Sequence, residues 1–400
     1  MHYEVKLSND IYWIGVNDRR THLFENYWPL PFGVSYNSYL IVDEKVTLVD
    51  TVSITTMDTY LDKLYSLLNG RKIDYLIINH MEPDHSGAVR AIVNEYPDIK
   101  IIGNKKTFPM LEGFYNITQN LIEVGDDEIL ETGKHKLRFI LTPMVHWPET
   151  MMTFDETDKV LFSADAFGSY GTLDGGVFDD EINLDFYADE LRRYYSNIVG
   201  KYGLQVQKAL DKLEGVEVKM IASTHGPIWR SHIPEIIQRY RCWSSYQTEE
   251  GVVIVFGSMY GNTEKMAEII ARSLTEEGIK NVRIYDSSKT HSSYIISDIW
   301  KYRGVILGSS AYNGGIFTPM RALIRELEHI LPKNHYLGIF GSMSWGGGGV
   351  RSLEQFAEIV KWELIAPSVE AKHAAHNADV NALINIGKGM AQRLKADRVK

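Results

Sequence analysis

The chain has 400 residues, more than one hydrophobic core normally supports, so two domains are expected. Its formal net charge of -10 argues against a nucleic-acid-binding surface, which requires a basic patch. No apolar run reaches membrane-spanning length, and the start of the chain is too polar for a signal peptide. The single cysteine excludes an internal disulfide framework and a four-cysteine iron centre. A cytoplasmic protein is therefore expected.

The first 70 residues are rich in short β-strand patterns. Runs of β-branched and aromatic residues separated by turn residues predict meandering strands, at residues 12–16, 38–42 and 46–50. Apolar side chains at residues 57–68 have helical spacing, and the following Asn69-Gly70 is a typical helix terminator.

The next apolar run, residues 73–78, ends in four potential metal ligands within six positions. These are His80, Glu82, Asp84 and His85. A helical pattern follows at once, which predicts that the four lie in a loop between a strand and a helix, with Pro83 delaying the helix and Ser86 as its N-cap. Two imidazoles and two carboxylates this close together are more typical of a metal site than of polar turn residues.

Three later apolar runs each end in one further potential ligand. They are His146 after residues 136–145, Asp165 after residues 160–164 and His225 after residues 218–224. A lone histidine at a strand end is usually a structural hydrogen-bonding group, but the repeated pattern predicts that the strands gather these side chains at one sheet edge. Four imidazoles and three carboxylates are too many for one ion and suit two.

A mostly helical segment, residues 185–213, precedes the last of these runs, and the polar and aromatic residues 239–250 are expected to cross a domain boundary. The predicted domains are therefore residues 1–250 and residues 251–400. In the second domain, strands near positions 252, 282, 304, 336 and 364 alternate with helices, which is typical of a doubly wound parallel sheet.

Three strand-end loops of the second domain carry hydroxyls, aromatic rings and glycines. The first loop precedes a helix predicted at residues 264–277, and such a helix N-terminus binds anions through free backbone N–H groups. The loop lacks both the Walker A and the dinucleotide fingerprints. The expected cofactor-binding residues are Ser258, Met259, Tyr260, Gly261, Asn262, Thr263, Ser309, Ala311, Tyr312, Asn313, Gly314, Ser342, Met343, Ser344, Trp345, Gly346 and Gly347.

This inventory fits FMN. Its phosphate is expected on Ser258, Tyr260, Asn262 and Thr263, and its ring between Tyr312 and Trp345. The alternatives are a flavodoxin-like scaffold without a nucleotide, or a response-regulator-like domain. The latter would carry acidic residues at the end of the first strand, and residues 258–263 have none.

The ligand spacing resembles that of the metallo-β-lactamase superfamily, whose His-x-His-x-Asp-His motif is followed by a distant His, Asp and His. Here Glu82 takes the place of the second histidine. An anionic oxygen ligand suits iron or manganese better than zinc. This departure favours redox chemistry over hydrolysis.

Both motif sets in this order, together with residues 33–40, resemble the flavodiiron proteins (A-type flavoproteins) over essentially the whole chain. The resemblance implies an α/β protein, with a metallo-β-lactamase-like αββα sandwich followed by a flavodoxin-like doubly wound parallel sheet. It implies one iron held by His80, Glu82 and His146, a second iron held by Asp84, His85 and His225, and Asp165 as the bridge. It also implies reduction of dioxygen to water, of nitric oxide to nitrous oxide, or of both, with electrons relayed through FMN.

The resemblance further implies a head-to-tail homodimer, or a dimer of dimers, that brings the FMN of one subunit beside the metals of the other. Electrons are expected from a separate rubredoxin or a reductase. One alternative is a metallo-β-lactamase-type hydrolase with a regulatory flavodoxin module, which Glu82 argues against. Another is an electron carrier or redox sensor with a vestigial metal domain, which the complete set of seven ligands argues against.

Overall fold

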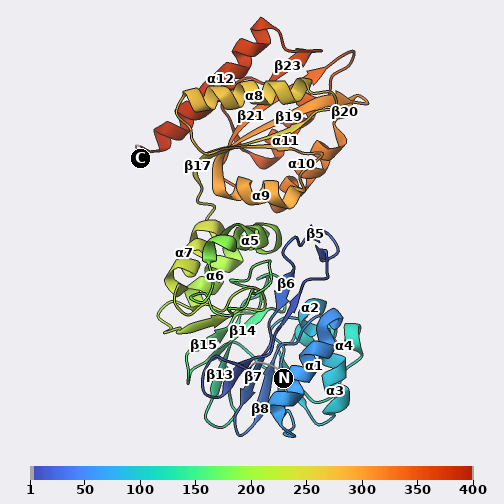
Figure 1. Ribbon diagram of the computed structural model, residues 1–400, viewed down its shortest axis with the longest axis vertical. Helices are drawn as coiled ribbons and strands as arrows, with labels where there is room; N and C mark the ends of the chain where they lie inside the picture. Colours follow the sequence, from blue (N-terminus) through green and yellow to red (C-terminus); the bar gives the residue numbers. More distant parts are fainter. Residues whose placement is uncertain (1–3, 399–400) are drawn as a thin grey trace. The chain divides into compact units, whose positions relative to one another are not determined.

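The structure, a computed structural model, describes residues 4–398. The chain divides into two compact units, with the boundary between Ser244 and Ser245 (Figure 1). Within the described residues, no helix combines the length and the apolar character needed to cross a bilayer.

The first unit contains two main sheets. One has the strand order β1-β2-β7-β8-β9-β10-β11 and the other the order β12-β13-β14-β15-β16. The strands of the first are Val5–Lys6, Ile11–Trp13, Tyr39–Val42, Val46–Val49, Tyr75–Ile77, Lys100–Gly103 and Leu121–Glu123 in that order. Those of the second are Ile129–Glu131, Lys136–Leu141, Met151–Asp155, Val160–Phe162 and Met220–Ala222. Buried side chains of both sheets form one hydrophobic cluster, as in a sandwich of two sheets.

Helices complete this unit. They are α1 (Met57–Leu68), α2 (Pro83–Ser86), α3 (Val89–Glu95), α4 (Thr107–Tyr115), α5 (Ala188–Tyr194), α6 (Gly203–Lys212) and α7 (Ile233–Ser244). Short helical turns lie at Ile54–Thr56, Leu184–Phe186, Tyr195–Val199 and Gly200–Tyr202, and two small hairpins pair β3 (Val16–Asp18) with β6 (Val34–Tyr36) and β4 (Leu23–Phe24) with β5 (Trp28–Pro29). Helices α1, α3 and α4 lie beside the first sheet (Figure 1). The predicted metallo-β-lactamase-like sandwich is confirmed.

Helix α1 illustrates how the local sequence specifies its element. Tyr60, Leu64 and Leu68 recur at intervals of four and are the buried residues of the helix. Asn69 then adopts the left-handed conformation with a φ of 46°, and its N–H donates to the Tyr65 carbonyl, which ends the helix. The helix predicted at residues 57–68 is confirmed at both ends.

The expectations for Pro83 and Ser86 are wrong. Pro83 begins the short helix α2, and Ser86 is its last residue. Proline suits a first helical turn, where its fixed φ is already helical and no backbone N–H is needed. The Ser86 hydroxyl donates to the carbonyls of Met81 and Glu82 at 2.9 and 3.0 Å and caps no following helix. Asp84 and His85 therefore lie on a helical turn and not in a loop.

The second unit is a sheet of order β18-β17-β19-β21-β22, with β20 paired to β19 and β23 paired to β21. From β17 to β23 the strands are Glu249–Gly257, Val282–Asp286, Tyr302–Tyr312, Gly315–Ile316, Tyr336–Met343, Glu363–Leu364 and Val369–Lys372. The helices are α8 (Asn262–Glu276), α9 (Ser292–Lys301), α10 (Thr318–Ile330), α11 (Gly349–Val360) and α12 (Asn377–Asp397). Helices α8 and α12 pack on one face of the sheet and α9 to α11 lie on the other (Figure 1). The predicted doubly wound parallel sheet is confirmed.

Two boundaries differ from expectation. Residues 309–312 were predicted as loop but belong to β19, which turns at Asn313 and Gly314 and pairs back with β20. Both turn residues have positive φ values of 49° and 72°, the conformation that an Asn-Gly hairpin requires. The stretch 239–250 is not a single connection, because its first part completes α7 and its end begins β17.

Candidate metal centre and flavin cavity

The metal-ligand candidates sit beyond the carboxyl ends of strands that run in one direction. In the second sheet, β13 and β15 are both antiparallel to β14, and β15 is parallel to β16. Strands β13, β15 and β16 therefore run in the same direction, and the residues that follow them, His146, Asp165 and His225, lie at the same edge of the sheet. In the first sheet, β9 leads to His80 and to helix α2.

All seven predicted metal ligands are brought together, in two groups. The first contains His80, Glu82, His146 and Asp165, and the second contains Asp84, His85 and His225. Within each group one nitrogen or oxygen of every residue lies within 4.8 Å of the others. Six of these seven side chains are buried, and that of Asp84 is partly exposed.

Asp165 stands between the two groups. Its Oδ2 lies 2.9 Å from His146 Nε2 and 3.4 Å from His80 Nε2. Its Oδ1 lies 2.9 Å from His85 Nε2 and 3.8 Å from His225 Nε2. One oxygen of this carboxylate therefore faces each group, which is the arrangement of a ligand that bridges two ions.

The remaining distances fit a metal shell. Glu82 Oε2 lies 3.2 Å from His80 Nε2 and 3.1 Å from His146 Nε2. Asp84 Oδ2 lies 3.2 Å from the Nε2 atoms of both His85 and His225. Neighbouring ligands of an ion with bonds of about 2.1 Å stand about 3 Å apart, so these separations match one coordination shell per group.

Unsatisfied polar atoms give an independent test of the same fit. Both carboxylate oxygens of Asp84, both ring nitrogens of His85 and Nε2 of His225 are buried and make no hydrogen bond within residues 4–398. Buried polar atoms almost always have a partner. Burial lowers the pKa of His85, yet Asp84 and Asp165 outweigh it and raise that pKa to about 9, so the site attracts positive charge. The residues present fit a pair of metal cations.

Outer hydrogen bonds hold several of these side chains. His225 Nδ1 donates to the Ser35 carbonyl at 2.7 Å, and the Thr224 hydroxyl donates to Asp165 Oδ1 at 2.6 Å. His80 Nδ1 lies 2.8 Å from the carboxylate of Glu149. Burial opposes ionisation of Glu149, but hydrogen bonds from His80 and from the Met81 N–H lower its pKa. Sequence reasoning missed these partners, because each lies outside the ligand motifs.

Aromatic rings surround the second group. Phe24 contacts the His225 ring edge-on with ring centroids 5.3 Å apart, and Tyr194 lies 5.4 Å from the same ring. The Tyr170 ring packs edge-on against the rings of Phe24 and Tyr194, with centroid distances of 5.5 and 5.0 Å. On the first group, Trp147 contacts His80 edge-on at 5.3 Å. These rings keep bulk water away from the carboxylates and so strengthen their interaction with cations.

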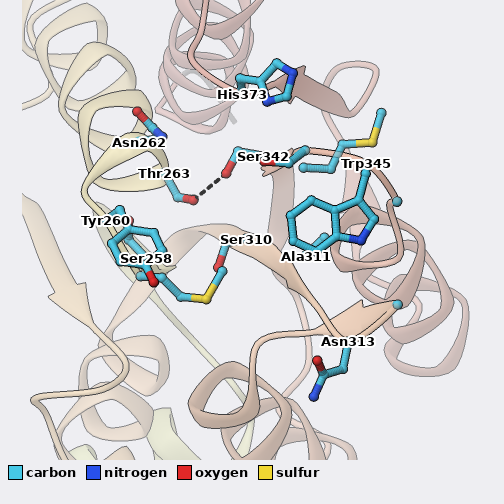
Figure 2. Close-up of a pocket in the computed structure, with 15 residues that line it drawn as sticks. Ser258, Tyr260, Asn262, Thr263, Ser310, Ala311, Asn313, Ser342, Trp345 and His373 are labelled. Atoms are coloured by element: carbon cyan, nitrogen blue, oxygen red, sulfur yellow. Dashed lines mark hydrogen bonds between the residues drawn. The ribbon is translucent and has the colours of Figure 1, made fainter.

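The second unit contains a cavity of about 440 Å³ at the carboxyl edge of its sheet (Figure 2). Thirteen of the predicted cofactor-binding residues line it: Ser258, Met259, Tyr260, Asn262, Thr263, Ala311, Asn313, Gly314, Ser342, Met343, Ser344, Trp345 and Gly346. Ser310 and His373 line it as well and were missed, since Ser310 was passed over within its loop and His373 follows a strand that sequence reasoning did not separate. Pockets of this size hold small-molecule cofactors.

Four predicted residues do not line the cavity. Gly261 is the N-cap of α8, Ser309 bonds to its own strand and to the Phe317 N–H, Tyr312 packs edge-on against Phe317, and Gly347 lies close to the Glu370 carboxylate. Gly261 still shapes the loop, because its φ of 86° is a conformation that other residues rarely adopt.

One end of the cavity is built for an anion. Helix α8 begins at Asn262, so its first backbone N–H groups are free for a ligand. The Ser258 hydroxyl accepts from the Gly261 N–H at 3.0 Å, and the Thr263 and Ser342 hydroxyls are 2.9 Å apart (Figure 2). Tyr260 and Trp345 lie on opposite sides of the cavity and are 90% and 99% exposed. The residues fit a flavin that carries a phosphate.

Two family models match the chain in the same order as its folds. Residues 34–226 match the "ODP family beta lactamase" model, and residues 254–387 match the "Flavodoxin" model. A β-lactamase-like domain with a metal-ligand cluster, followed by a flavodoxin domain, defines a two-domain flavoprotein of the oxidoreductase class.

Similar proteins place the chain within that class. It is 33% identical to the nitric oxide reductase of Moorella thermoacetica over 98% of this chain and 100% of that protein. It is 32% identical to an anaerobic nitric oxide reductase flavorubredoxin of Escherichia coli O1:K1 over 92% of this chain and 78% of that one. The rubredoxin oxygen:oxidoreductase of Desulfovibrio gigas superposes with a TM-score of 0.96 at 31% identity, over 100% of both chains.

The flavodiiron protein of Giardia intestinalis has a TM-score of 0.94 at 25% identity, covering 99% of this chain and 98% of that chain. The chain belongs to the flavodiiron protein family, as its sequence motifs predicted. It is an oxidoreductase, and membership implies a flavin in its second domain and iron in its first.

Proposed function

We propose that this oxidoreductase reduces dioxygen to water, nitric oxide to nitrous oxide, or both, at a non-haem diiron centre. Electrons reach the centre through FMN from an external donor such as rubredoxin. The observation that carries the proposal is Asp165, whose two oxygens each face a separate group of ligands. A carboxylate shared in this way supports a pair of ions, and the anionic oxygen of Glu82 in the first group favours iron over the zinc of a hydrolase.

One iron would be held by His80, Glu82 and His146, the other would be held by Asp84, His85 and His225, and both would share Asp165. The three carboxylates of the set supply negative charge that stabilises the ferric state, as redox chemistry requires. When bound, the two irons would supply adjacent binding positions for two nitric oxide molecules or one dioxygen, together with two electrons.

Residues around the proposed ligands hold them in position and exclude water. The Thr224 hydroxyl holds Asp165 by its Oδ1, and the Ser35 carbonyl fixes the His225 ring so that Nε2 faces the cluster. Phe24 and Tyr194 pack against that ring and exclude water from it. Preorganised ligands in a dry cavity require little rearrangement when the ions change charge.

The second cavity supports FMN in particular. The start of α8 and the hydroxyls of Ser258 and Thr263 form a cradle for a phosphate, which riboflavin lacks. We assign the ring to the space between Tyr260 and Trp345, where aromatic side chains can stack on it.

We further propose that the chain works as a head-to-tail homodimer, or a dimer of dimers, with electrons passing between subunits. The exposed aromatic residues Tyr260 and Trp345 support contact of this cavity with another surface. The names of the similar proteins from Escherichia coli and Desulfovibrio gigas connect those proteins with rubredoxin, which supports rubredoxin as a donor here.

The central experiment measures iron and FMN per chain and follows anaerobic reaction of the reduced protein with nitric oxide and, separately, with dioxygen. We expect two irons and one FMN per chain and rapid reoxidation by at least one of the gases. Protein that contains zinc in place of iron, or that is reoxidised by neither gas, would contradict the proposal.

Subunit mixing tests the electron path. A Glu82→Ala subunit keeps its FMN but loses the metal centre, and a Ser258→Glu subunit keeps the metals while its new carboxylate repels the phosphate. Neither variant alone should consume gas. If electrons cross between subunits, a refolded mixture should regain activity, whereas a mixture as inactive as its parents would rule out the intersubunit path.

A further inference from the structure

Glu149 is a buried carboxylate that touches the metal-ligand set without belonging to it. It lies between β13 and β14 and is 1% exposed. Its Oε1 is 2.8 Å from His80 Nδ1 and accepts a hydrogen bond from the Met81 N–H at 2.9 Å. Its second oxygen is buried without a hydrogen-bond partner in the described part of the chain. Such a group is costly to bury, so a role in the site is the natural explanation.

The contact with His80 determines which ring nitrogen carries the proton. A carboxylate accepts at Nδ1, so the proton resides there and the lone pair of Nε2 points at Glu82 and Asp165. The bond from Met81 ties the same carboxylate to the backbone next to His80. Glu149 thereby holds the ligand ring and its supporting backbone in one geometry.

No second-group imidazole is hydrogen-bonded to such an anion in the described part of the chain, and the buried carboxylate of Asp50 bonds to the backbone N–H groups of Asn79 and His80 and not to a ring. His225 Nδ1 donates to a neutral backbone carbonyl, that of Ser35. His85 Nδ1 makes no hydrogen bond within the described residues. Among residues 4–398, Glu149 is the only carboxylate outside the seven ligands found hydrogen-bonded to a ligand imidazole. The two metal positions therefore differ in the partners of their imidazoles, since only the first has a ring bonded to a carboxylate outside the ligand set.

We propose that Glu149 is a positioning residue that makes the ion held by His80, Glu82 and His146 the more tightly bound of the two. The inference rests on the proposed diiron function and deepens it. A carboxylate partner raises the basicity of a ligand imidazole and so strengthens its bond to the metal. The extra negative charge also interacts more favourably with a ferric than with a ferrous ion. In the half-reduced centre, the ferric ion therefore occupies the His80 position.

The test replaces Glu149 with glutamine, which has the same shape and still accepts both hydrogen bonds but has no charge. Loss of an outer partner typically weakens metal binding 10- to 100-fold. In wild-type protein we expect a chelator to remove the two ferrous ions in two phases. In Glu149→Gln the slower phase should accelerate by about 10- to 100-fold, while the faster phase stays unchanged. Glu156→Gln removes a carboxylate at the opposite end of β14, where it pairs with Arg138 and not with a ligand, and should change neither phase.

A second readout follows the valence of the ions. An electron paramagnetic resonance redox titration monitors the half-reduced centre, and ⁵⁷Fe Mössbauer spectra distinguish its ferric and ferrous positions. We expect Glu149→Gln to raise mainly the potential of the second reduction step, in which the ion at the His80 position is reduced, and to decrease the spectral difference between the two positions. Unchanged spectra together with wild-type iron release would overturn the assignment.

The experiments distinguish failure of the proposed function from failure of the role assigned to Glu149. If the wild-type protein does not bind two irons, the proposed function fails, whatever Glu149 does. If it binds two irons and Glu149→Gln releases both at wild-type rates, the role of Glu149 fails and the proposed function stands. If Glu149→Gln lowers the melting temperature before iron loading and loosens both ions equally, Glu149 is merely structural and the inference is wrong. Should the glutamine variant not fold, Glu149→Asp retains the charge, and iron release slower than that of Glu149→Ala supports the inference while equal rates contradict it.

Discussion

Replacing Asp165 with asparagine tests the centre at its most constrained point. The substitution keeps the shape of the side chain and an oxygen that can accept from the Thr224 hydroxyl, now 2.6 Å away. It removes the one negative charge that both groups share. Burial opposes ionisation of Asp165, but the neighbouring His85 and His80 hold its pKa well below the ordinary range, so wild-type protein presents a full carboxylate at neutral pH.

The size of the effect follows from the distances. Asp165 Oδ2 is 2.9 Å from His146 Nε2, and its Oδ1 is 2.9 Å from His85 Nε2. Removing a residue that only hydrogen-bonds to a metal ligand lowers metal affinity about 10- to 100-fold, or about 1.4 to 2.8 kcal/mol. Asp165 is a proposed ligand of both ions, so each should bind at least about 100-fold more weakly.

The assay measures iron per chain after gel filtration and then the consumption of nitric oxide and dioxygen by reduced protein. We expect Asp165→Asn to lose iron from both positions and to lose gas consumption with it. Thr224→Val provides the graded comparison, because it removes the hydroxyl donor but leaves the carboxylate, and its loss should stay within about 10- to 100-fold. An Asp165→Asn protein with two irons and wild-type turnover would refute the bridging role.

Three further predictions concern the cofactor, pH and the core. In fluorescence titrations, Thr263→Val should weaken FMN binding about fivefold, the effect of one hydrogen bond of about 1 kcal/mol, and leave riboflavin binding unchanged. The control Thr275→Val, on the same helix, should change the binding of neither flavin. Equal losses of affinity for both flavins in Thr263→Val would contradict a phosphate contact. Burial opposes protonation of His135, but its bond to Asp155 outweighs burial and raises the pKa. The stability that protonated His135 contributes should therefore be fully present below the unfolded pKa of about 6.5 and be lost as pH rises through the higher folded pKa. The difference in melting temperature between wild type and His135→Gln should shrink from pH 5.5 to alkaline pH. A difference that stays constant over this range would exclude the linkage. Leu64→Ala empties a fully buried position of α1 and should cost about 2 to 5 kcal/mol in denaturant unfolding, whereas a loss below 1 kcal/mol would mean that the site collapses around the smaller side chain.

Local patterns predicted the elements where neighbours along the chain decide the conformation. Helix α1 has its apolar residues and its Asn69 terminator within one short stretch, so its limits were readable. The Asn313-Gly314 hairpin also had a local signal, which the prediction overlooked in favour of a loop. At Pro83 two local rules competed, and the preference of proline for a first helical turn prevailed.

By itself, the sequence determined the identity of the seven candidate ligands and their order at strand ends, because the residue types and the apolar runs before them are properties of single segments. Only the tertiary structure decided how they divide. The separate oxygens of Asp165 toward two groups, and the pairing of Glu149 with His80, join residues far apart in the chain. Such contacts depend on the packing of strands from two sheets, and no spacing along one segment encodes the direction in which a distant side chain points.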